Sequence, residues 1–171
     1  MTARRFWRIA LPLAMVVCTV VIWGQSLLPA KTSAVASDAV EKVLVPDADE
    51  MTMEDYVQPK WWTKFFTLPN HPLGPSFFIR KGAHLIEFGI LGVLWYACGR
   101  VHGRRLLWLW GLPTGVVDEC LQRLSGRGAL VADAVIDVVG YLLGCGFMLL
   151  IIWMWQKRKN KACIFGQAVI Q

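Results

Sequence analysis

The chain has 171 residues, which is within the range of one domain. Its hydrophobic fraction of 56%, its nine tryptophans and its mean hydropathy of +0.46 are too apolar for an ordinary soluble protein. The net charge of +6 does not indicate a nucleic-acid partner, because the basic residues cluster beside hydrophobic runs instead of on a polar module. The five cysteines form no CxxC pair, so neither a disulfide framework nor a zinc ribbon is indicated.

Four segments reach the length of about 20 residues that a helix needs to cross a bilayer. The outer two are clearest, because residues 9–30 and 138–156 carry no charge. The middle two reach this length only by including polar residues, His84 and Glu87 in one and Asp118 and Glu119 in the other. We therefore predict an all-α, polytopic membrane protein of a single domain, with four transmembrane helices at approximately 7–28, 82–99, 105–122 and 134–155.

The distribution of charge predicts the orientation. The N-terminal arginines, the turn at 100–105 and the tail at 157–171 are basic and contain no acid, whereas all twelve acids lie within 31–87 or 118–137. The positive-inside rule then places both termini and the turn in the cytoplasm. An alternative is a cleaved signal peptide that ends near residues 34–36, which would leave three spans.

The segment 31–79 is then an extracytoplasmic loop. Apolar residues at helical spacing predict a short amphipathic helix over 33–45, which an acidic stretch at 47–55 follows. Trp61, Trp62, Phe65 and Phe66 are typical of an anchor at the membrane interface.

Ionisable residues gather at the extracytoplasmic ends of spans two to four. Lys81, His84 and Glu87 are spaced by three and share one helix face. Asp118 and Gln122 are neighbours on span three, and Asp133 and Asp137 lie one turn apart on span four. Burying isolated carboxylates in a bilayer is costly, which favours pairing across helices. The alternative is that these groups lie hydrated in the headgroup layer.

Two further features bear on partners. Gly140 and Gly144 continue the face of Asp133 and Asp137, and small residues at this spacing let another helix, or a second copy of the chain, pack closely. A metal site from His84 and Glu87, with Glu119 or Asp137, is an alternative. The cluster contains only one histidine, so we predict neither a metal nor another cofactor.

These segments resemble the VanZ-like family. Its two motifs are matched by the residues Arg80, Lys81, Ala83, His84, Glu87 and Phe88, and by Asp118, Glu119, Gln122, Gly126, Arg127, Asp133, Asp137 and Gly140. The chain departs from many members at Leu121, where they have histidine. The resemblance implies a bacterial cytoplasmic-membrane protein, and the family's namesake is associated with resistance to teicoplanin. It does not imply a reaction.

The preferred hypothesis is a non-enzymatic protein of the cell envelope that lies in the bilayer and recognises an anionic lipid or a lipid-linked cell-wall precursor. Guanidinium and ammonium groups suit phosphate. The candidate ligand-binding residues are Arg80, Lys81, Gln122, Arg127, Asp133 and Asp137, with Arg123 as a further phosphate contact.

Two alternatives remain open. The first is a hydrolase or transferase in which His84 is the general base and Glu87, Asp118 or Glu119 assists it. The second is a small proton-coupled transporter.

Overall fold

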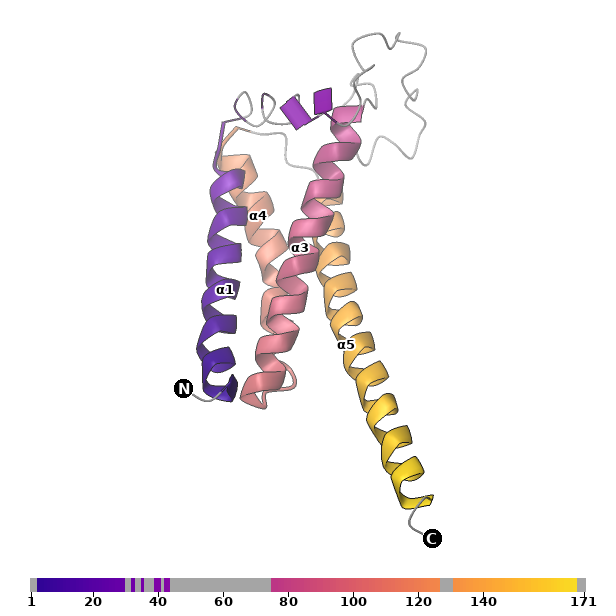
Figure 1. The fold of residues 1–171 in the computed structure, drawn as a ribbon. Helices are drawn as coiled ribbons and strands as arrows, with labels where there is room; N and C mark the ends of the chain where they lie inside the picture. Colours follow the sequence, from indigo (N-terminus) through magenta and orange to yellow (C-terminus); the bar gives the residue numbers. More distant parts are fainter. Residues whose placement is uncertain are drawn as a thin grey trace.

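The computed structural model describes residues 3–29, 75–126 and 131–168, together with a few positions between 32 and 43. It is an assembly of helices: α1 (Ala3–Ser26), α3 (Pro75–His102), the 3-10 helix η3 (Leu107–Gly111), α4 (Pro113–Leu124) and α5 (Val131–Ala168) (Figure 1). The predicted aromatic anchor at 61–66, most of the predicted amphipathic helix and Arg127 lie outside the described residues.

Three helices are long and apolar enough to cross a membrane: Arg5–Ser26, Phe78–His102 and Ala132–Asn160. Large apolar side chains on them, such as Val20, Leu143 and Phe147, are more than half exposed. Exposed apolar surface of this extent is typical of a protein that contacts lipid. Three of the four predicted spans are therefore confirmed as helices of this kind.

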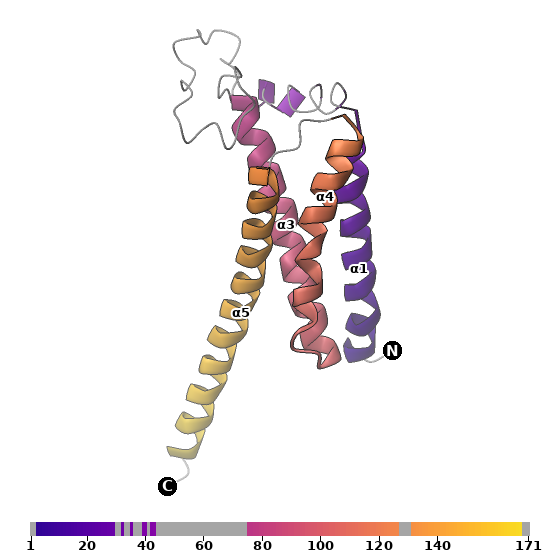
Figure 2. The same cartoon turned by 180° about the vertical axis from the view of Figure 1, so that it is seen from behind.

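The prediction of one continuous helix over 105–122 is wrong. The backbone forms η3 first, and α4 begins only at Pro113. Proline lacks the amide hydrogen of an α-helical hydrogen bond and is favoured in the first turn of a helix, so it marks a start here. The two pieces together measure about 28 Å at their usual rises of about 2.0 and 1.5 Å per residue. They run back along the bundle beside α1 (Figure 2).

Helices α3 and α5 approach so closely that glycines are required between them. A Cβ atom on Gly140 would lie 2.5 Å from the carbonyl oxygen of Leu85, and one on Gly144 would overlap the carbonyl oxygen of Gly89. Tyr141 lies in the core beside them. The glycine face that could have served a second copy of the chain is thus packed against α3 within one chain.

The arrangement gives the bundle two different ends. The N-terminus and the turn between α3 and η3 lie at one end, and α5 extends past the same end to the C-terminus (Figure 1). The end of α1, the end of α4 and the start of α5 lie together at the opposite end, which we call the polar end (Figure 2).

Candidate functional site

Four helices contribute side chains to one group at the polar end, which we call the polar cluster: Ser26, His84, Asp118, Gln122 and Asp137. The side chains of Ser26, Asp118 and Asp137 are each at most 1% exposed. Buried polar groups are stable only when they have partners, so the contacts of each one identify what the cluster is built to hold.

Asp118 on α4 is held by two donors. The hydroxyl of Ser26 donates to Oδ1 at 2.5 Å, and the amide of Gln122 donates to Oδ2 at 2.7 Å. The Ser125 hydroxyl lies 2.9 Å from the carbonyl oxygen of Ser26 and 2.8 Å from that of Gln122, so the ends of α1 and α4 are tied together. Donors on both oxygens hold this carboxylate in a fixed direction.

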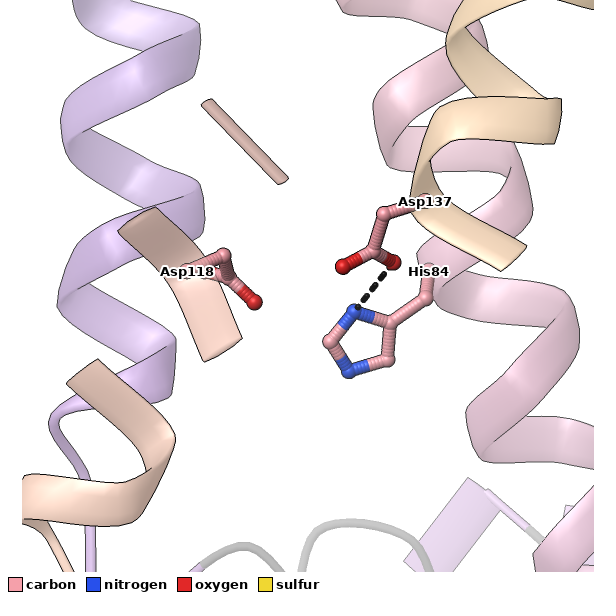
Figure 3. A group of neighbouring side chains, drawn as sticks. All are labelled: His84, Asp118 and Asp137. Carbon is pink, nitrogen blue, oxygen red and sulfur yellow. Dashed lines mark ion pairs between the residues drawn. The ribbon is translucent and has the colours of Figure 1, made fainter. Parts of the chain in front are cut away.

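Asp137 on α5 is in the opposite situation. Its Oδ1 lies 3.4 Å from Nδ1 of His84 on α3, as an ion pair when the imidazole is protonated. Neither carboxylate oxygen has a hydrogen-bond partner among the residues that the structure describes. Figure 3 shows Asp137 and His84 on one side of a small space and Asp118 facing them from the other.

The two carboxylates are close enough to interact strongly. One ligand atom from each of His84, Asp118 and Asp137 lies within 4.8 Å of the others. Two unit negative charges at this separation repel by about 3–4 kcal/mol at an effective dielectric constant of about 20. The geometry therefore favours a positive charge between them, either a protonated His84 or a bound cation.

Charged residues surround the cluster at the same end. Lys81 forms an ion pair with Asp133, which joins α3 to α5 as the His84–Asp137 pair does. Both pairs confirm the predicted pairing across helices. Arg80 and Arg123 are exposed.

Two further acids lie on these helices. Glu87 is half-buried, and both carboxylate oxygens of Glu119 are buried with no hydrogen-bond partner in the described ranges.

An apolar groove runs along α1, α3, η3 and α4 and ends close to the cluster. Its volume is about 440 Å³. The Trp23 indole nitrogen donates to the carbonyl oxygen of Thr114 at 3.5 Å, one helical turn before Asp118. The groove is lined by Met15, Val16, Thr19, Val20, Trp23, Trp95, Trp110, Pro113, Thr114 and Val117.

The family model described as VanZ/LLP1 matches residues 11–155. The chain belongs to the VanZ/LLP1 family. The match extends the resemblance seen in the motifs to most of the chain, including α1 and the segment that contains η3. No curated protein and no solved structure matches the chain.

Compared with the sequence-based prediction, this VanZ/LLP1 protein brings together His84, Asp118, Gln122 and Asp137 as expected. It adds Ser26 at the end of α1, which was not among the candidate site residues from the sequence. The metal alternative from the sequence combined His84 and Glu87 with Glu119 or Asp137, whereas the structure groups His84 and Asp137 with Asp118.

Proposed function

We propose that this VanZ/LLP1 protein acts at the bacterial cell envelope by binding a lipid with an anionic headgroup at the polar end of its bundle. The observation that carries the proposal is the apolar groove that ends beside a buried polar cluster with exposed arginines near it. Lipid pockets combine these two features, a wall for the acyl or isoprenoid chain and a few polar groups for the headgroup.

The proposed orientation places the polar end outside the cytoplasmic membrane. The segment of η3 and α4 has nearly the length of the hydrocarbon core, about 30 Å, so it is proposed as the fourth crossing. Arg100 lies in the last turn of α3, Arg104 and Arg105 lie in the turn beyond it, and α5 carries Lys157 and Arg158. The positive-inside rule supports a cytoplasmic location for both basic groups.

Headgroup contacts are assigned to the cations at the polar end. Arg80 and Arg123 are exposed and free to reach outward, and a guanidinium group binds phosphate through two parallel hydrogen bonds. Asp133 holds Lys81 in place through its ion pair. The ligand is an anionic phospholipid or a lipid-linked cell-wall precursor, and the second would connect the protein with teicoplanin susceptibility.

A second candidate function rests on the pair of His84 and Asp137. A histidine oriented by a carboxylate is the arrangement of a general base, as a hydrolase or transferase requires. The orienting residue in this scheme is Asp137, because Asp118 is already bound by Ser26 and Gln122.

Lipid binding by purified variants tests the first function. Arg80→Gln and Arg123→Gln should each weaken retention of phosphatidylglycerol in mixed micelles about tenfold, since a hydrogen bond to a charged group contributes about 1.5–3 kcal/mol. Phosphatidylcholine should bind weakly to all variants. The matched controls are Arg104→Gln and Arg105→Gln at the opposite end, and equal losses in controls and test variants would contradict the proposal.

The teicoplanin susceptibility of a complemented strain separates the two functions. If headgroup recognition rests on the arginines alone, His84→Gln should keep much of the phenotype, because glutamine retains a hydrogen-bond donor. Arg127→Lys should be more damaging, because lysine lacks the planar pair of donors. An inactive His84→Gln beside a fully active Arg127→Lys would favour the enzyme instead.

A further inference from the structure

We propose that His84, Asp118 and Asp137 bind one divalent transition-metal ion, of the Mn²⁺ or Zn²⁺ class. The metal site itself is independent of the lipid. Its use rests on the proposed function: the open coordination position of the ion accepts a phosphate oxygen of the anionic headgroup.

The spacing of the three side chains is the first argument. Each offers one ligand atom, and these atoms lie within 4.8 Å of one another. Ligands at about 2.0–2.2 Å from a tetrahedral ion lie roughly 3.4 Å apart. The atoms would have to close by up to about 1.4 Å to reach one ion. The three residues come from α3, α4 and α5 and already face a common space (Figure 3).

The second argument is that the Asp137 carboxylate has no hydrogen-bond partner. Its side chain is 1% exposed, and in the described part of the chain neither of its oxygens makes a hydrogen bond, although Oδ1 lies 3.4 Å from Nδ1 of His84. It is aimed at the space that Asp118 faces from the other side (Figure 3). A buried carboxylate with empty acceptor positions is stable when it binds a cation.

The third argument is the support around Asp118. Ser26 and Gln122 fix this carboxylate through hydrogen bonds, and the Ser125 hydroxyl lies within reach of the backbone of both. Metal-binding carboxylates are commonly held by such donors, and a carboxylate that accepts two hydrogen bonds still has lone pairs for an ion.

The donor set indicates the class of ion. One imidazole nitrogen and two carboxylate oxygens suit Mn²⁺ or Zn²⁺, whereas Ca²⁺ takes six to eight oxygen ligands. Three protein ligands also leave a coordination position open. The two positive charges of the ion would offset those of the two carboxylates, which otherwise repel a phosphate brought to the same end of the bundle.

Binding of Mn²⁺ alone tests the site, because thiolates bind this ion weakly and the cysteines do not compete. The full-length protein, carrying a tag without histidine, is treated with EDTA in a neutral detergent and titrated with MnCl₂. The free ion is followed by electron paramagnetic resonance. We expect one Mn²⁺ per chain, with at least tenfold weaker binding in His84→Gln and in Asp137→Asn.

The matched control is His102→Gln, at the far end of α3. It should bind Mn²⁺ as the parent does. Circular dichroism of each variant identifies any that fails to fold, and Mn²⁺ should raise the Tm of the parent and of this control but not of a folded His84→Gln. Absence of a bound ion in the parent, or equal affinity in His84→Gln and His102→Gln, would overturn the site.

Retention of phosphatidylglycerol is then measured with Mn²⁺ and with EDTA. Retention that falls at least tenfold in EDTA supports the bridge from ion to phosphate. Retention that is unchanged by EDTA overturns the bridge and leaves the metal site standing. If Arg80→Gln and Arg123→Gln retain phosphatidylglycerol as well as the parent does while Mn²⁺ still binds, the proposed function alone is refuted.

Discussion

Replacing Ser26 by alanine removes one of the two donors that hold the buried carboxylate of Asp118. The Ser26 hydroxyl lies 2.5 Å from Oδ1, and Asp118 is 0% exposed, so water does not replace the lost donor. A hydrogen bond to a charged group contributes about 1.5–3 kcal/mol, and the free energy of unfolding should fall by that amount. In a chain of this size 1 kcal/mol corresponds to about 2–4 °C, so the Tm should fall by roughly 3–12 °C.

The measurement is thermal unfolding in detergent, with Thr19→Val as the matched control. The Thr19 hydroxyl donates to the carbonyl oxygen of Met15 within its own helix, and that oxygen already accepts a helical hydrogen bond. Losing the Thr19 hydroxyl should therefore lower the free energy of unfolding by less than 1 kcal/mol. A double-mutant cycle with Asp118→Asn completes the test, because Ser26→Ala should cost less once the charge is gone. Two results would show that Asp118 is hydrated and that the cluster is not a buried unit. The first is a Ser26→Ala that destabilises the protein no more than Thr19→Val does. The second is a Ser26→Ala that destabilises the Asp118→Asn variant as much as it destabilises the parent.

The remaining predictions concern packing and orientation. Gly144→Ala should destabilise the protein by about 1–3 kcal/mol in the same assay, because the new methyl group overlaps the carbonyl oxygen of Gly89. The control is Gly146→Ala, whose methyl group meets nothing within 4 Å and should be neutral or stabilising. Equal effects of the two substitutions would contradict the close contact of α3 and α5. In a variant without native cysteines, Leu124→Cys should react with an impermeant maleimide in intact cells and Arg104→Cys only after permeabilisation, and the reverse result would invert the proposed orientation.

Much of the fold could be predicted because the signals are local. The lengths of the apolar runs determine which segments can cross a bilayer, and three of them are confirmed as such helices. A spacing of three determines that Lys81 and His84 share a helix face, whatever that face contacts. The break before Pro113 also had a local signal, although the pattern of apolar residues alone predicted one helix there.

The partners inside the candidate site depended on the tertiary structure. Asp118 could have paired with any base at the polar end, but its partner across the bundle is the hydroxyl of Ser26, 92 residues away. Asp137 faces His84 because Gly140 and Gly144 let α5 approach α3 until backbone atoms nearly touch, and this approach sets which turns lie opposite each other. A sequence lists the residues on each helix face. The distance and register between two helices follow instead from how their side chains fit. This distance and this register bring two carboxylates and an imidazole within 4.8 Å of one another.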